Sequence, residues 1–154
     1  MAVATDMSLR EALPLPRPAS VLHLTLCEIG QYGRSASVIE TAKRIGDGVA
    51  GRGFSLSVTR RMHFPGAGAL VLAADEIPAE LAALNRGLVR ALRREGFKPP
   101  SGFKPHLTFG YEKSRLVPEA ALLHPIKWSP ETFELVSSPR GETRHDILGR
   151  WRLT

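Results

Sequence analysis

Two short segments of the chain share one pattern, a histidine and a threonine two positions apart with apolar neighbours. They are His23-Leu24-Thr25-Leu26 and His106-Leu107-Thr108-Phe109. Each lies in a stretch with the composition of a strand, where residues two apart point to the same face of a sheet. Core packing gives no reason for the same polar pair to occur twice. We therefore interpret the two segments as parts of one functional site.

The residue types in these segments suit general acid–base chemistry on a phosphodiester. Histidine titrates near neutral pH, so one ring can accept a proton from water or a hydroxyl while the other donates a proton to a leaving oxygen. The threonine hydroxyls can donate hydrogen bonds to non-bridging phosphoryl oxygens, where negative charge accumulates. The sequence contains no His-Glu-x-x-His motif and no cysteine pair. We therefore predict no metal site and no cofactor.

Hydrophobic periodicity predicts the elements that must position these residues. One helix is marked by Pro78 at its start, leucines at helical spacing and Gly96 at its end. The order of strands and helices contains two similar halves, which predicts an α+β fold with an internal duplication. The predicted strands cover residues 20–27, 54–64, 69–74, 104–111, 132–137 and 146–153, and the predicted helices cover 35–50 and 78–96.

Length and composition limit the class of protein. A chain of 154 residues with 43% hydrophobic and 23% charged residues is typical of one globular domain and excludes a disordered chain. No apolar run is long enough for a membrane span, so we expect no membrane partner. The single cysteine, Cys27, cannot form an internal disulfide, which favours a reducing, cytoplasmic location. The sequence leaves the oligomeric state open.

The excess of positive charge is concentrated in one segment. The whole chain has a formal net charge of +6, and the basic segment 86–115 alone holds eight lysines and arginines against two glutamates. One interpretation is a solvated helix face, and the other is an approach path for a polyanion. The basic residues are Arg86, Arg90, Arg93, Arg94, Lys98, Lys104, Lys113 and Arg115.

Three other signals receive structural interpretations. Gly46-Asp47-Gly48-Val49-Ala50-Gly51 matches G-x-G-x-x-G, but it ends a helical pattern and leads into a strand, whereas a dinucleotide site needs the reverse order. Cys27 shares a strand face with His23 and is interpreted as a small wall residue. His145 has two interpretations: it is a structural residue of the C-terminal strand, or it is a weak candidate for the site.

The paired motifs resemble the H-x-T motifs of the 2H phosphoesterase superfamily, and within it the LigT-like RNA 2′,3′-cyclic phosphodiesterase family, also called the 2′-5′ RNA ligase family. The resemblance begins at about Ser20 and covers most of the chain. Beyond the first motif it is carried by Phe103-Lys104-Pro105-His106-Leu107-Thr108-Phe109, Pro125-Ile126-Lys127-Trp128, Phe133-Glu134-Leu135-Val136-Ser137-Ser138, Thr143-Arg144-His145 and Ile147-Leu148-Gly149-Arg150-Trp151.

This resemblance implies a bilobal α+β domain over residues 20–154, with duplicated antiparallel sheets related by a pseudo-twofold axis, helices packed outside and a central cleft. It implies an RNA 2′,3′-cyclic phosphodiesterase that leaves a 2′-phosphate without a metal; some members also join RNA ends reversibly through 2′,5′ linkages. His23 and His106 would be the acid–base pair, with their roles unassigned, and Thr25 and Thr108 the phosphate donors. Lys104 shares strand parity with His106, so we expect it to add positive charge.

The chain departs from the family pattern in two places. Residues 1–20 are Pro-rich, and we expect an irregular lead-in there, with the family's first strand and helix absent. An incomplete first lobe would leave an unpaired strand edge. Gly110-Tyr111 follows the second motif, where many relatives have other residues, including basic ones.

Two alternatives to this function stay open. The chain could be a non-catalytic RNA- or nucleotide-binding module that uses the H-x-T cleft as a phosphate clamp, and a short first lobe would favour that interpretation. It could also be an enzyme for a small cyclic nucleotide, in which case the basic segment would matter little. The partners are therefore RNA ends or nucleotides with a 2′,3′-cyclic phosphate.

Overall fold

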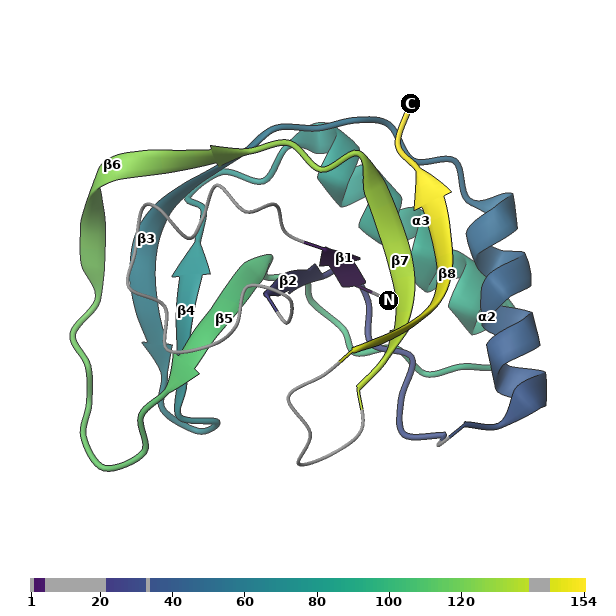
Figure 1. Ribbon diagram of the computed structural model, residues 1–154, viewed down its shortest axis with the longest axis horizontal. Coiled ribbons are helices and arrows are strands. Elements are labelled where there is room, and N and C mark those ends of the chain that lie inside the picture. The colour runs from purple at the N-terminus through teal and green to yellow at the C-terminus, as the bar shows by residue number, and fades with distance from the viewer. Residues whose placement is uncertain (1, 5–21, 33, 139–144) are drawn as a thin grey trace.

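The computed structural model describes residues 2–4, 22–32, 34–138 and 145–154. In these ranges eight strands form one antiparallel sheet in the order β6-β3-β4-β5-β2-β1-β7-β8, and two helices accompany it (Figure 1). The predicted α+β class is confirmed. The elements are β1 (Ala2–Ala4), β2 (His23–Thr25), α2 (Ala36–Gly48), β3 (Leu56–Phe64), β4 (Ala69–Ala73), α3 (Ala79–Arg94), β5 (His106–Tyr111), β6 (Ala120–Trp128), β7 (Thr132–Ser137) and β8 (Asp146–Arg152).

The sheet consists of two four-stranded halves that meet where β2 pairs with β5. One half is β6-β3-β4-β5 and the other is β2-β1-β7-β8. The register pair between the halves is Leu24 opposite Leu107. The order of predicted elements suggested that each half is one continuous stretch of the chain. The structure differs, because β7 and β8, from the end of the chain, pair on the side of β1 and β2. The two H-x-T motifs therefore lie on the central pair of strands.

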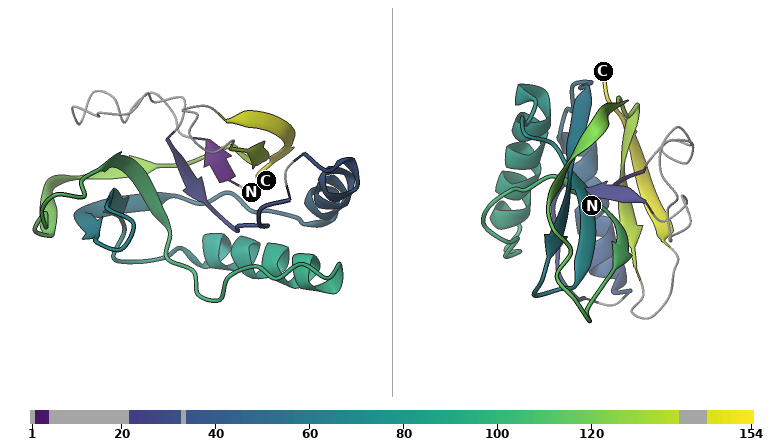
Figure 2. Two further views of the ribbon diagram at one scale, coloured as in Figure 1. Left: turned by 90° about the horizontal axis from the view of Figure 1, so that it is seen from below. Right: turned by 90° about the vertical axis from the view of Figure 1, so that its left-hand side faces the viewer.

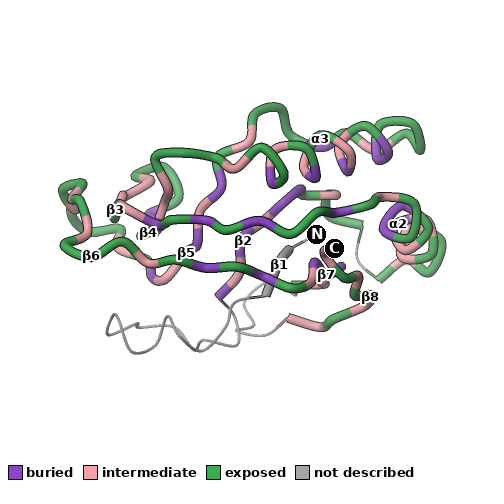
Figure 3. Tube along the Cα trace, turned by 90° about the horizontal axis from the view of Figure 1, so that it is seen from above, coloured by how far each residue is buried: buried purple, intermediate pink, exposed green. Residues whose placement is uncertain are grey.

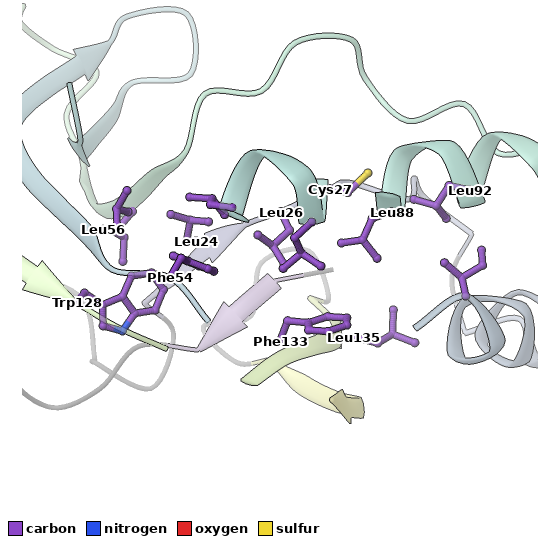
Figure 4. Packing of buried hydrophobic residues seen from close by; sticks show 14 of the residues in the cluster. Leu24, Leu26, Cys27, Phe54, Leu56, Leu88, Leu92, Trp128, Phe133 and Leu135 are labelled. Carbon is purple, nitrogen blue, oxygen red and sulfur yellow. The ribbon is translucent and has the colours of Figure 1, made fainter. Parts of the chain in front are cut away.

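Helix α3 forms as its leucine spacing predicts. Leu81, Leu84, Leu88 and Leu92 are all buried, and they belong to one cluster with Leu24 of β2 and with Leu26, which follows β2. Figure 4 shows Leu88 and Leu92 in this cluster. The helix ends in a Schellman motif, in which the Phe97 N–H donates to the Leu92 carbonyl at 3.0 Å and the Gly96 N–H donates to the Arg93 carbonyl at 3.1 Å. Gly96 takes the required left-handed conformation, with φ +85°. This helix lies across one face of the sheet (Figure 2).

Helix α2 lies beside the β8 edge of the sheet and contacts β7 and β8 (Figures 1 and 2). Gly46 and Gly48 of the G-x-G-x-x-G segment form its last turn, and Gly51 follows the helix. The structural interpretation of that segment is thus confirmed. The Trp151 ring packs directly on Gly46, and its Nε1–H donates to Asp47 Oδ1 at 2.7 Å. No helix in the described ranges combines the length and apolar character needed to cross a membrane.

The contact between Gly46 and Trp151 leads to a stability prediction. A Cβ atom at position 46 would overlap the Trp151 ring. Although alanine favours a helix more than glycine does, we expect Gly46→Ala to lower the free energy of unfolding by about 1–3 kcal/mol, because overpacking displaces the ring. Chemical denaturation measures this change. Gly48→Ala is the control, because nothing lies within 4 Å of a Cβ at Gly48; equal stability changes in both variants would contradict the prediction.

Strand parity separates the core from the H-x-T side chains. Leu22, Leu24 and Leu26 are buried, whereas His23 and Thr25 between them are half-buried. Figure 3 shows how burial is distributed over the strands and helices. Strand β5 repeats this alternation with a buried Leu107 between two half-buried motif residues. Leu24, Leu26 and Leu107 belong to the core cluster that α3 joins. The motif residues therefore point away from these leucines, as the alternation predicts, and Thr25 and His106 reach a groove that α3 also lines.

Two strands were not predicted from the sequence. β1 contradicts the expectation of an irregular lead-in, because Ala2–Ala4 pairs with β2 on one side and with β7 on the other. β2 is consequently paired by both β5 and β1, and the expected unpaired edge is not found there. The rest of the lead-in, residues 5–20, lies outside the described ranges. β6 pairs with β3 despite Pro125, because it forms an edge of the sheet, where a missing N–H is tolerated.

Candidate functional site

The register of the central strands brings the two motifs together. Because Leu24 lies opposite Leu107 in an antiparallel pair, His23 falls opposite Thr108 and Thr25 falls opposite His106. Side chains directly opposite each other have Cβ atoms about 4.5–5.5 Å apart, and diagonal neighbours such as the two histidines are about 7–8 Å apart. All four predicted site residues are half-buried. They form a square of two histidines and two threonines, related by a local twofold axis through the leucine pair.

A backbone hydrogen bond orients the His106 ring. His106 Nδ1 lies 2.7 Å from the Lys104 carbonyl oxygen. A carbonyl can only accept a hydrogen bond, so Nδ1 carries the proton and Nε2 is the nitrogen that can gain or lose one. The Phe64 ring packs edge-to-face on the His106 ring, with centroids 5.1 Å apart. His106 therefore presents Nε2 in a fixed orientation.

The environment of His23 differs from that of His106. The His145 ring packs edge-to-face on the His23 ring, with centroids 4.3 Å apart and an interplanar angle of 71°. His145 immediately precedes β8, so it comes from the far end of the chain. The structure thus places the weak candidate His145 against the first motif. The adjoining Thr143 and Arg144 lie outside the described ranges.

The threonine hydroxyls are available to a ligand. Neither Thr25 nor Thr108 makes a side-chain hydrogen bond to any residue in the described ranges. Strand β5 has a bulge immediately after Thr108, where its pairing with β4 shifts between Val71 and Leu70. Bulges of this kind change the direction of a strand. Beyond the bulge, Tyr111 is 59% exposed in the position where the sequence departs from the family pattern.

Thr25 and His106 also line a groove of about 1000 Å³. Lys104 lines it too. β5 begins only at His106, so the strand parity on which the expectation for Lys104 was based does not extend to that residue. Cys27 is a buried wall residue of this groove, and burial raises the pKa of its thiol. A raised pKa keeps the sulfur protonated near neutral pH, which agrees with a wall residue and not with a nucleophile.

Several contributors to the site carry no sequence signal. Asn85 of α3 donates from Nδ2 to the Leu26 carbonyl at 2.6 Å and so attaches α3 to β2 next to the first motif. Phe64 reaches His106 from β3, and the Lys104 carbonyl acts through the backbone. These contacts join residues far apart in the chain, or use an atom common to all residues, so no motif could indicate them.

Comparisons with known proteins agree with the fold. The sequence pattern of the 2′-5′ RNA ligase superfamily matches residues 5–142. Among curated protein sequences, none matches the chain.

Solved structures match the whole fold. Escherichia coli LigT, in a complex with 3′-AMP, has a TM-score of 0.78 and 25% identity, with 99% of this chain and 95% of LigT covered. A phosphoesterase crystal structure has a TM-score of 0.79 and 25% identity over the same shares. A Thermus thermophilus protein has a similar fold, with a TM-score of 0.74 at 21% identity, and 99% and 95% covered. Because the superfamily pattern spans most of the sequence and the fold spans nearly all of it, the chain belongs to the 2′-5′ RNA ligase superfamily of two-histidine phosphoesterases.

Proposed function

We propose that the chain is an RNA 2′,3′-cyclic phosphodiesterase, which opens the cyclic phosphate at an RNA end and leaves a 2′-phosphate. His23 and His106 are its acid–base pair, and Thr25 and Thr108 hold the phosphoryl oxygens. The observation that carries this proposal is the register of β2 and β5, which sets two histidines diagonally across two threonines on one half-buried face.

The reaction follows from this arrangement. One histidine, in its neutral form, accepts a proton from water as the water oxygen forms a bond to phosphorus. The bond between phosphorus and the 3′ oxygen breaks, and the second histidine, in its protonated form, donates a proton to that oxygen. The threonine hydroxyls donate to the non-bridging oxygens, where charge accumulates. The products are a 3′-hydroxyl and a 2′-phosphate, and the two histidines have exchanged protonation states.

The fixed tautomer of His106 supports a role in proton transfer. With Nδ1–H donated to the Lys104 carbonyl, only Nε2 can exchange a proton with a ligand. The diagonal spacing of about 7–8 Å between the histidines leaves room for a phosphoryl group between them. The same steps, with an RNA 5′-hydroxyl in place of water, would form a bond from the 5′ oxygen to phosphorus and break the bond to the 3′ oxygen, which joins the RNA ends through a 2′,5′ linkage.

The similarity to LigT supports a nucleotide as the occupant of the cleft. LigT was crystallised with 3′-AMP, and the present chain covers 95% of that protein. The alternative of a non-catalytic phosphate clamp was favoured by a short first lobe. β1 pairs with β2 and β7, so a strand that this interpretation took as missing is present.

We expect turnover of a 2′,3′-cyclic-phosphate-ended oligonucleotide to continue in EDTA, because the proposed proton transfers use side chains alone. Mass spectrometry would identify the ring-opened product, and chromatography beside authentic 2′-phosphate and 3′-phosphate standards would show which oxygen carries the phosphate. Loss of turnover on chelation, restored by an added divalent ion, would overturn metal independence. Tight binding of the oligonucleotide without any turnover would instead identify the phosphate clamp.

A further inference from the structure

The groove that holds Thr25 and His106 is much larger than a single phosphate needs, and one of its walls is the face of α3. That wall carries four exposed arginines, and Lys104, on the segment 95–105 that returns from α3 to β5, also lines the groove. Arg86, Arg90 and Arg94 are spaced four residues apart, so they form one stripe about 12 Å long at 1.5 Å per residue. We call Arg86, Arg90, Arg93, Arg94 and Lys104 the groove cations.

The groove cations lack acidic partners. None of them forms an ion pair with a residue in the described ranges. By contrast, Arg44 pairs with Glu95 just beyond the C-terminal end of α3, and Arg60 pairs with Asp75. Glu28 is the one acidic residue among the described residues that line the groove. Like charges at this spacing repel one another, so the stripe has excess positive potential that an anionic chain would neutralise.

Aromatic side chains accompany the cations. Phe64 and Phe103 line the same groove, and both are half-buried. Phe64 already packs on the His106 ring, so it lies next to the proposed reacting group. Grooves that bind single-stranded nucleic acid combine cations along the backbone with aromatic rings on which bases stack. A mononucleotide would fill only the part of this groove beside the H-x-T motifs.

We propose that this groove binds the single-stranded RNA that precedes the cyclic phosphate, with the groove cations contacting backbone phosphates and Phe64 and Phe103 stacking on bases. This inference rests on the proposed function, and it makes the length of the RNA a determinant of specificity. The enzyme then prefers an oligonucleotide end over a cyclic mononucleotide. The basic segment 86–115 therefore contributes to substrate binding and is not only a solvated helix face.

The double variant Arg90→Gln/Arg94→Gln tests the proposal, because glutamine keeps helix propensity while removing two charges. The control is Arg52→Gln/Arg61→Gln, which removes two charges from exposed positions that do not line the groove. The rate constant kcat/KM is measured for a 2′,3′-cyclic mononucleotide and for a hexanucleotide with the same end, at several salt concentrations. Fluorescence anisotropy measures binding of a labelled hexanucleotide with an ordinary 3′-hydroxyl end.

The groove variant is expected to lose about tenfold or more in kcat/KM for the hexanucleotide at low salt and to leave the mononucleotide unchanged. The salt dependence of hexanucleotide binding should weaken, with the slope of log K against log salt falling by about 1.4 for two lost contacts to a single strand. Equal losses on both substrates, or equal effects of the control, would overturn the proposal. If the native protein turned over neither substrate, the proposed function would fail, and the anisotropy slopes would still decide whether the groove binds RNA.

Discussion

His106→Ala is expected to lower kcat for a 2′,3′-cyclic phosphodiester by about 100- to 10,000-fold, the range that general acid–base catalysis contributes. The substitution removes the Nε2 atom that the hydrogen bond to the Lys104 carbonyl orients, but it leaves Thr25 and the groove in place. KM should therefore change much less than kcat. His23→Ala is expected to have an effect of the same order, and the double variant should be little worse than either single one, because the two rings act in one step.

The pH dependence distinguishes the two histidines. The native enzyme should show a bell-shaped profile of kcat/KM, with the acidic limb from the base and the alkaline limb from the acid. Each single variant should lose one limb, and the limb that is lost assigns the role. His124→Ala is the matched control, because His124 is exposed on the edge strand β6 and should leave both limbs intact. Full activity in either motif variant would contradict the proposed mechanism.

Leu24→Ala is expected to lower the free energy of unfolding by about 2–5 kcal/mol, the usual cost of truncating a leucine in a core. Leu24 has no exposed surface, and it forms the register pair with Leu107 that joins the two halves of the sheet. Its side chain packs in the cluster with Leu26 and the leucines of α3. The loss thus combines the transfer free energy of the removed atoms with the cost of a cavity between α3 and the β2–β5 pair.

Urea denaturation followed by circular dichroism measures this loss. Leu123→Ala is the matched control, because Leu123 is 94% exposed on β6 and its truncation should change stability by no more than about 0.5 kcal/mol. Leu24→Met provides a milder variant if the alanine variant does not fold, with an expected cost below about 1.5 kcal/mol. If Leu24→Ala lowered the free energy of unfolding as little as the control does, packing of Leu24 at the β2–β5 pairing would not stabilise the joined halves of the sheet.

Local features of the fold were predictable because their causes are local. The leucine spacing of α3 and the left-handed residue Gly96 after it are properties of a few neighbouring residues. The two-residue spacing within each H-x-T motif likewise guarantees that His and Thr share a face of a strand. The strand bounds were less certain, and β2 and β5 proved shorter than their patterns suggested.

Pairing between distant segments was not predictable in this way. The short β1 carries only three residues, Ala2–Ala4, and it forms a strand because β2 and β7 supply hydrogen-bond partners on both sides. β6 tolerates Pro125 because of its place at the sheet edge. The return of β7 and β8 to the first half depends on the whole topology, and no local pattern records it.

The sequence by itself determined the residues that this proposal uses and the family that they indicate: two histidines and two threonines in repeated strand motifs, and a helix with a basic stripe. Only the tertiary structure decided how these parts combine. It set His23 opposite Thr108 across the sheet, placed His145 and Phe64 on different catalytic candidates, and joined the arginines of α3 to the motifs through one groove. The reason is physical: side-chain type and periodicity act between near neighbours, whereas register and packing depend on contacts that only the folded chain makes.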